Sequence, residues 1–143
     1  MNISLMRYSI LSFIIASIFV VTLSGCGSYG IGGPSEVEPN NTMNLADRVT
    51  GFEINGVIGM QGDEDWFVLN SQEGVNPTFI IYHDPGVDID FEVYNTTYGV
   101  TQRVGSALGT NSGDAVRVHT PGQAHIRVWA HQGMGPYRIQ IMP

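Results

Sequence analysis

An acidic turn beside two aromatic residues places side chains with opposed chemical demands next to one another. Asp63, Glu64 and Asp65 follow one another, and Trp66 and Phe67 come directly after them. The aromatic rings favour a core, whereas neighbouring carboxylates repel one another and favour water, hydrogen-bond donors or a cation. Because alternate residues of an extended chain point the same way, Asp63 and Asp65 would share a face and leave Glu64 outside it. Trp66 and Phe67 are expected to begin a core strand.

A second group of oxygen-bearing side chains lies upstream and consists of Glu36, Glu38, Asn40 and Asn41. Ca²⁺ takes roughly six to eight oxygen ligands at about 2.3–2.6 Å from carboxylates, carbonyls and water. Glu36 and Glu38 alternate, so both can face one ion. The alternative is a solvated acidic turn beside a capping asparagine, and the residue types favour the metal. The ligand spacing of an EF-hand is absent.

The first 25 residues have the features of an export signal. Arg7 precedes an apolar run over residues 10–23, and Leu23-Ser24-Gly25-Cys26 follows. The run is shorter than the roughly 20 residues that a transmembrane helix needs. The small residues before Cys26 resemble the bacterial lipobox, which implies cleavage before this cysteine and acylation, including palmitate, of its thiol. The alternatives are an uncleaved anchor and an ordinary secretory signal with a free thiol.

Cys26 is the only cysteine, so a disulfide within one chain is excluded. Acyl chains on Cys26 would anchor the protein stably in a membrane, since one chain alone binds only marginally. Residue 27 is glycine rather than the aspartate associated with inner-membrane retention. We therefore expect an exported lipoprotein of the cell envelope, held at the outer membrane or cell surface rather than the inner membrane. Residues 26–35 would form a glycine-rich tether, and residues 36–143 one domain.

The chain is acidic, with thirteen acids, six basic residues and a formal net charge of −7 at pH 7. Removal of residues 1–25, which contain Arg7 and no acid, makes the charge one unit more negative. This balance excludes nucleic acid as a partner and suits cations or solubility. The sequence contains neither the G-x-S-x-G motif of a nucleophile elbow nor the H-E-x-x-H motif of a zinc protease. We expect a protein that is not an enzyme.

Short alternating runs of apolar and polar residues, separated by turn residues, continue from residue 36 to the C-terminus. This pattern predicts an all-β fold, a single antiparallel β-sandwich of about eight strands with a jelly-roll-like arrangement. Residues 42–49 have the composition of a helical turn but lack the length for more. The expected strands are residues 52–58, 65–69, 78–82, 88–94, 100–104, 115–119, 124–130 and 137–142.

Some of these strands make specific predictions about side-chain direction. In the first, Phe52 and Val57 would take part in the inward alternation around a bulge at Gly56. In the fourth, Asp88 and Asp90 share the polar face, where a solvated surface is favoured over a second cation site.

The strand at residues 124–130 carries a group of side chains suited to ligand binding. His125, Arg127 and Trp129 alternate with apolar residues and therefore share the outer face. Trp129, with Arg127 and His125 beside it, would stack on a sugar ring or a peptide side chain. A loop that covers Trp129 explains the pattern equally well.

Four motifs occur in a specific order along residues 36–142. They are Glu36-Val37-Glu38-Pro39-Asn40-Asn41, Gly62-Asp63-Glu64-Asp65-Trp66, Asp88-Ile89-Asp90-Phe91 and Gly135-Pro136-Tyr137. This order resembles the bacterial pre-peptidase C-terminal domain, a β-sandwich appended to many secreted proteases and related to the collagen-binding modules of clostridial collagenases. Gln123-Ala124-His125 depart from the aromatic residues that members usually carry at this place.

The resemblance implies that the two acidic segments meet at a Ca²⁺ site, with ligands Glu36, Glu38, Asn40, Asn41, Asp63 and Asp65. In the family the domain accompanies an enzyme, whereas here it follows a predicted lipid anchor. We therefore expect a non-catalytic, calcium-stabilised domain that binds an extracellular protein or polysaccharide. Two alternatives stay open: a hydrolase or accessory module of a secreted protease, and a structural or secretion and assembly aid at the envelope.

Overall fold

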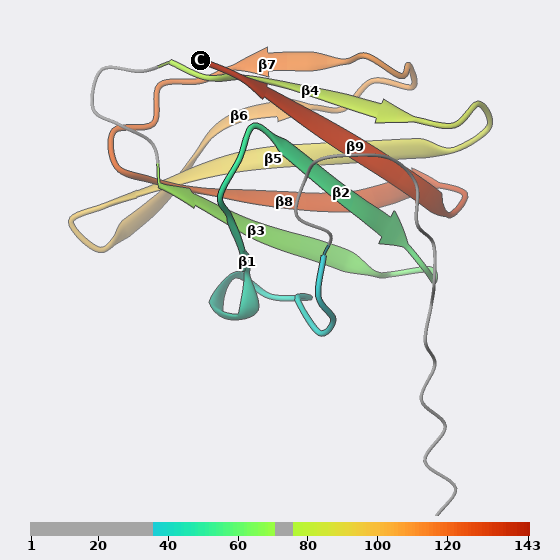
Figure 1. Cartoon of the computed structure of the whole chain (residues 1–143), viewed down its shortest axis with the longest axis horizontal. Helices are drawn as coiled ribbons and strands as arrows, with labels where there is room; N and C mark the ends of the chain where they lie inside the picture. The colour runs from blue at the N-terminus through green and yellow to red at the C-terminus, as the bar shows by residue number, and fades with distance from the viewer. Residues whose placement is uncertain (1–35, 71–75) are drawn as a thin grey trace, which may run out of the picture. The chain divides into compact units, whose positions relative to one another are not determined.

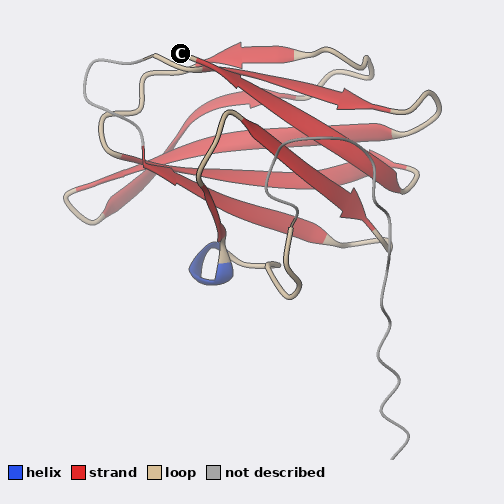
Figure 2. Ribbon diagram, viewed as in Figure 1, coloured by secondary structure: helices blue, strands red, loops and turns tan. Residues whose placement is uncertain are grey.

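The computed structural model describes residues 36–70 and 76–143. The predicted signal peptide, Cys26 and the predicted tether lie outside these residues. In the described part, the chain forms two β-sheets and one short 3₁₀-helix (Figures 1 and 2). The predicted all-β sandwich is confirmed. No helix in residues 36–70 or 76–143 has the length and apolar character needed to cross a membrane.

One sheet has five strands in the order β1-β3-β8-β5-β6. Neighbouring strands are antiparallel except at the edge, where β1 runs parallel to β3. The bounds of these strands are β1 Asp47–Val49, β3 Glu64–Asn70, β5 Asp88–Thr97, β6 Val100–Ala107 and β8 Gln123–Gln132.

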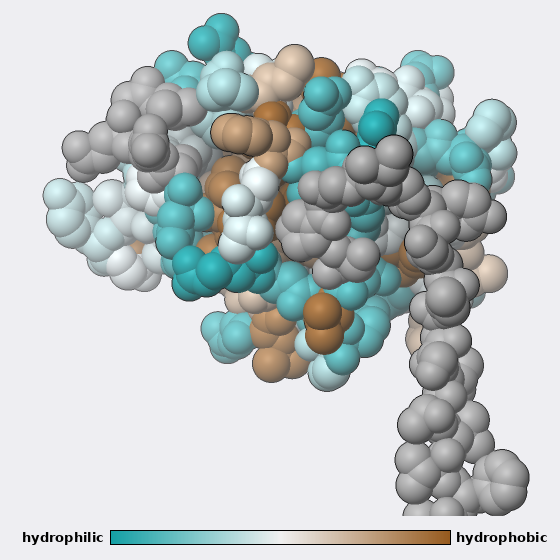
Figure 3. Space-filling model, in the orientation of Figure 1, coloured by the Kyte–Doolittle hydropathy of each residue, from teal (hydrophilic) through white to brown (hydrophobic). Residues whose placement is uncertain are grey.

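The other sheet has four strands in the order β2-β9-β4-β7, all antiparallel to their neighbours. The bounds are β2 Glu53–Ile58, β4 Thr78–His83, β7 Ala115–Arg117 and β9 Gly135–Met142. Hydrophilic residues cover most of the face drawn in Figure 3, with smaller hydrophobic groups between them.

The core lies between the two sheets and is built by the period-two alternation of the strands. Phe79 of β4 and Phe91 of β5 meet across it, with ring centroids 6.4 Å apart. Fully buried aliphatic side chains surround this pair, namely Ile54, Ile58, Ile81, Ile89, Val93, Ile126, Val128 and Ile139. Burial of this apolar surface is the main stabilising term of the fold.

The stretch 42–49, expected as a helical turn, divides into two elements. The 3₁₀-helix η1 occupies Met43–Leu45, and the edge strand β1 follows it. With this strand, residues 36–70 and 76–143 contain nine strands rather than the expected eight or so. A three-residue strand carries too short an alternation to be recognised in sequence, and it forms because β3 offers an edge for it to pair with.

The expected side-chain directions of β2 are wrong in part. Phe52 and Val57 are exposed, whereas Ile54, Gly56 and Ile58 face inward. Strand β2 pairs with β9 in a continuous register, so no bulge occurs at Gly56. Phe52 lies in a bend before the strand and falls outside its alternation. Within the strand, Gly56 takes an inward position and Val57 an outward one, and an inward glycine makes the alternation hard to see in the sequence.

Candidate metal centre

The segment that precedes η1 crosses from one sheet to the other. The backbone N–H of Glu36 donates to the carbonyl of Asn55 in β2 at 3.1 Å. The Val57 N–H donates to Glu36 Oε2 at 3.0 Å. On the other sheet, the N–H of Trp66 in β3 donates to the Asn40 carbonyl at 3.0 Å. Residues 36–40 therefore join the free edge of β2 to the edge of β3.

Asp65 faces the core of the sandwich. It alternates with Phe67 on β3, and both side chains are buried, with Asp65 wholly inaccessible to solvent. The Tyr137 hydroxyl of β9 donates to Asp65 Oδ2 at 2.6 Å. The expectation of a core position for Trp66 is wrong, because alternation that buries Asp65 and Phe67 places the half-buried Trp66 on the outer face.

Three carboxylates converge at this point. Oxygens of Glu36, Glu38 and Asp65 all lie within 4.8 Å of one another. Oδ1 of Asp65 is buried and has no hydrogen-bond partner in the described part of the chain. A buried polar atom without a partner is costly, so a group that satisfies Asp65 Oδ1 would stabilise the fold.

The electrostatics of this carboxylate cluster disfavour its full ionisation. Burial is the main cause that raises the pKa of Asp65 to about 9, and the neighbouring Glu36 carboxylate adds to the rise. Burial also raises the pKa of Glu36. Desolvation and the charge of Asp65 hold the pKa of the Tyr137 hydroxyl well above its usual value. At neutral pH the cluster must therefore take up a proton or a cation.

The donor set fits a hard divalent cation. Three carboxylates offer up to six oxygens, and Ca²⁺ prefers such ligands, whereas structural zinc sites use sulfur and nitrogen. Glu36, Glu38 and Asp65 would hold the ion. Bound there, Ca²⁺ would neutralise the repulsion among the carboxylates and cross-link the N-terminal segment to β3.

The other residues predicted as ligands lie in different positions. Asn40 is wholly buried, and its Oδ1 has no partner in the described residues. Asn41 is exposed. Asp63 precedes β3, and its Oδ2 accepts the Gly59 N–H at 2.8 Å, so it closes the turn between β2 and β3.

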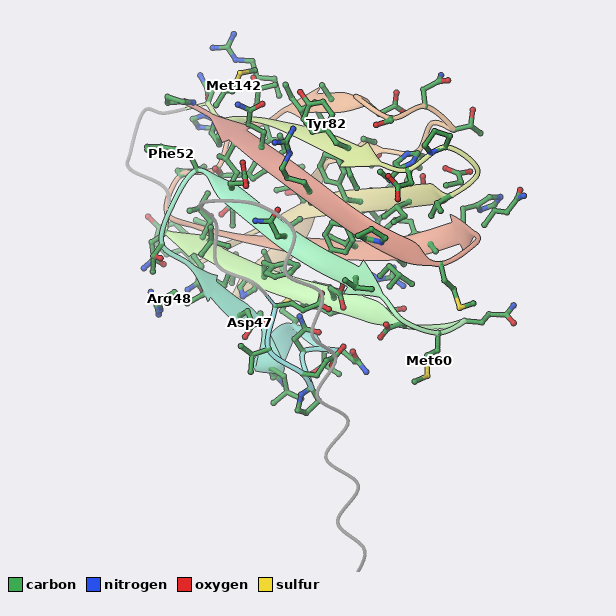
Figure 4. The ribbon with its side chains drawn as sticks, turned by 45° about the vertical axis from the view of Figure 1, so that its right-hand side comes forward. Asp47, Arg48, Phe52, Met60, Tyr82 and Met142 are labelled. Atoms are coloured by element: carbon green, nitrogen blue, oxygen red, sulfur yellow. The ribbon has the colours of Figure 1, made fainter. Side chains whose placement is uncertain are left out.

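Sequence reasoning missed Asp47 as part of this region. Oδ2 of Asp47 accepts the Val37 N–H at 2.6 Å and the Asn40 side-chain amide at 3.4 Å. Asp47 lies on β1 beside the N-terminal segment (Figure 4). It therefore holds the loop that carries Glu36 and Glu38. No periodicity links positions 37, 40 and 47, so the sequence alone gave no signal for this contact.

A glycine in β2 makes room for the cluster. A Cβ on Gly56 would collide with the ring and hydroxyl of Tyr137 and with the Glu36 carboxylate. Gly56 faces inward at the point where β2 pairs with Tyr137 of β9. The absent side chain lets the Tyr137 hydroxyl reach Asp65, which lies on the opposite sheet.

Similarity to known proteins is found at the level of fold. No model of a known protein family and no curated protein matches the chain. Among solved structures, the pre-peptidase C-terminal domain of collagenase from Bacillus anthracis matches with a TM-score of 0.57 and 16% sequence identity. The chain resembles this domain in fold. The match covers 68% of this chain and 94% of the collagenase domain.

The predicted ligand-binding group lies on the outer face of the five-stranded sheet, where Arg127 has two acidic partners. Its Nε and Nη2 donate to Glu64 at 3.0 and 2.5 Å, and its Nη1 donates to Glu92 at 3.5 Å. Arg103 also donates to Glu92, at 2.5 Å. Hydrogen bonds from Arg127 lower the pKa of Glu64. Glu64 thus lies outside the carboxylate cluster, in an ion-pair network.

The aromatic residues of this face form two groups. The Arg127 guanidinium lies over the Trp129 ring, 4.8 Å from its centroid. Trp66 and Tyr94 pack together with centroids 5.6 Å apart. His125 is 91% buried rather than exposed, and burial lowers its pKa, so it offers little surface to a ligand. Arg127 and Trp129 are both half-buried and are the accessible members of the predicted group.

Proposed function

We propose that residues 36–143 form a non-catalytic binding module, closed by Ca²⁺, on an exported lipoprotein anchored through Cys26. The observation that supports closure by Ca²⁺ best is the convergence of Glu36, Glu38 and the buried Asp65 within 4.8 Å. The likeness in fold to a collagenase's pre-peptidase C-terminal domain fits an accessory module.

A hydrolytic role for the cluster has little physical support. A general acid or base must come within hydrogen-bond distance of its substrate. Asp65 is wholly buried and accepts the Tyr137 hydroxyl, and no substrate reaches it without opening the sandwich. If the protein were a hydrolase, the wild type would turn over a substrate, and the Asp65→Asn variant would lose this activity while it stayed folded.

The outer face of the five-stranded sheet is the proposed ligand surface. Trp129, flanked by Arg127, offers a π-face beside a guanidinium, which suits a sugar ring or a peptide side chain. Trp66 and Tyr94 extend the aromatic surface on the same sheet. We infer that an extracellular polysaccharide or protein binds there.

A binding screen against glycans and matrix proteins tests this proposal. The Trp129→Ala variant should weaken binding of the ligand found by at least about tenfold, the loss expected of a buried aromatic anchor. Tyr82→Ala is a matched control, because Arg138 lies 4.7 Å over the Tyr82 ring on the other sheet (Figure 4). Equal losses in both variants, or none in Trp129→Ala, would reject the proposed face.

A further inference from the structure

The start of β5 carries two aspartates with unsatisfied oxygens. Asp88 and Asp90 alternate on the strand, on the side opposite the buried Ile89 and Phe91. Asp90 is only 6% exposed. Oδ1 of Asp88 and Oδ1 of Asp90 are both shielded from solvent, and neither has a hydrogen-bond partner in the described part of the chain. Alternate positions at the start of β5 thus carry two shielded carboxylate oxygens without donors.

The next acid along the same face shows what these aspartates lack. Glu92 is equally buried, but it accepts hydrogen bonds from Arg103, Arg127 and Tyr94. These bonds overcome the effect of burial and lower the pKa of Glu92. The ion-pair network ends at Glu92 and does not extend to Asp90, which lies two residues earlier on the same face of β5.

No arginine or lysine occurs in the segments that meet at this end of the sheet. These are residues 59–63, 84–90, 108–114 and 130–136. Burial and then the charge of Asp88 raise the pKa of Asp90, and Asp114 and Glu92 add to the rise while His131 opposes it. Asp90 therefore lies among other acids, with one histidine as the nearby basic group.

We propose that Asp88 and Asp90 form a second site for a hard divalent cation, Ca²⁺, which is separate from the Glu36–Glu38–Asp65 cluster. Asp90 belongs to the outer face of β5, whereas Asp65 faces the core from β3, so the two sites share no ligand. Two carboxylates, completed by water, correspond to the weak extracellular class of Ca²⁺ sites, with Kd on the order of 10⁻⁴–10⁻³ M. The second site would respond to external Ca²⁺ rather than hold it permanently.

Terbium luminescence tests this site directly, because Asp90 pairs in register with Trp129 of β8. Tb³⁺ substitutes for Ca²⁺ and emits when a nearby tryptophan is excited. The full chain in a non-ionic detergent should show tryptophan-sensitised emission that millimolar Ca²⁺ displaces. The Asp65→Asn variant should retain it, which separates the second site from the carboxylate cluster.

Two substitutions at the same end of the sheet decide the outcome. In the Asp65→Asn background, where the carboxylate cluster no longer contributes, Asp90→Asn should weaken Tb³⁺ binding by at least about tenfold, since ligand charge sets the affinity of such sites. Asp84→Asn removes one exposed charge nearby and should change affinity less than about twofold. If circular dichroism shows that the Asp90→Asn variant does not fold, Asp88→Asn is tested in its place. Unchanged binding in the aspartate variant used, or an equal loss in Asp84→Asn, would overturn the proposal.

Discussion

Asp65 is the residue on which the account of this protein depends. Its carboxylate is buried in the sandwich, receives one hydrogen bond from Tyr137 and lies against Glu36 and Glu38. A carboxylate in these surroundings is stable only when a proton or a cation neutralises it. Whether a proton or a cation neutralises Asp65 depends on the pH and the Ca²⁺ concentration. The stability of the domain is therefore sensitive to both.

Without metal, the stability of the wild-type protein should fall as the pH rises. The folded pKa of Asp65, about 9, lies above its ordinary value of 3.8. The folded state therefore holds the proton more tightly, and this stabilisation is lost between about pH 4 and about pH 9. Thermal unfolding in chelator across this range is the measurement.

The Asp65→Asn variant isolates this effect from other titrating groups. Its amide cannot titrate, so its melting temperature in chelator should fall less between about pH 5 and about pH 9 than that of the wild type. Ca²⁺ binding expels the proton, and its stabilising effect on the wild type should therefore grow with pH. Parallel pH profiles for both proteins would show that Asp65 does not hold the proton.

At the scale of elements, the candidate centre depends on β2 as much as on β3. Gly56 of β2 leaves the space into which Tyr137 and Glu36 fit. The N-terminal segment then bonds to the free edge of β2 through Glu36. Changes in β2 should therefore act on the centre although β2 supplies no carboxylate to it.

Gly56→Ala should destabilise the domain by about 1–3 kcal/mol, the usual cost of overpacking. It should also reduce the stabilisation by Ca²⁺, because the added methyl group displaces Glu36 and the Tyr137 hydroxyl. Gly59→Ala is the control, since a Cβ there meets only Asp63 Oδ2 at 3.7 Å and should cost less than about 0.5 kcal/mol. Denaturant unfolding with and without Ca²⁺ measures both effects, and equal costs in the two variants would contradict this packing role.

Alternation in the sequence predicted most strands, because a half-buried strand must repeat every two residues. It failed where the inward residue is not hydrophobic. Gly56 and Asp65 both face the core, and the expected directions of Val57 and Trp66 were wrong for this reason. Core positions ordinarily hold apolar residues, so an acid that faces the core breaks the usual pattern. Positions that break such local rules are often functional.

The carboxylate cluster was predictable only in part. Glu36, Glu38 and Asp65 belong to the predicted set, and the structure brings them together. Asp63 and Asn41 resemble ligands by type, but one closes a turn and the other is exposed. Asp47 was missed because its role arises from the parallel pairing of β1 with β3, a tertiary contact that no local pattern specifies.

At the scale of the whole molecule, the acidic domain and the predicted anchor belong to one proposal. An acidic surface is repelled by anionic lipid, so membrane attachment would depend on acylation rather than on electrostatics. Metabolic labelling with palmitate in a bacterial host should mark the wild-type protein. Cys26→Ser should abolish the label and release the protein from the membrane fraction, and a labelled or membrane-bound variant would contradict the predicted anchor.

Thermal unfolding of residues 36–143 with and without Ca²⁺ tests the central claim most directly. At about 100 times Kd, a ligand that binds only the folded state stabilises it by about 2.7 kcal/mol. For a domain of this size, the melting temperature of the chelator-treated protein should rise by about 10 °C. Glu53→Gln, which changes an acid of β2 outside the cluster, should respond like the wild type. Asp65→Asn should lose most of the response and keep only the small stabilisation that the weaker second site supplies. A wild-type melting temperature that millimolar Ca²⁺ leaves unchanged would show that Glu36, Glu38 and Asp65 do not hold a stabilising ion.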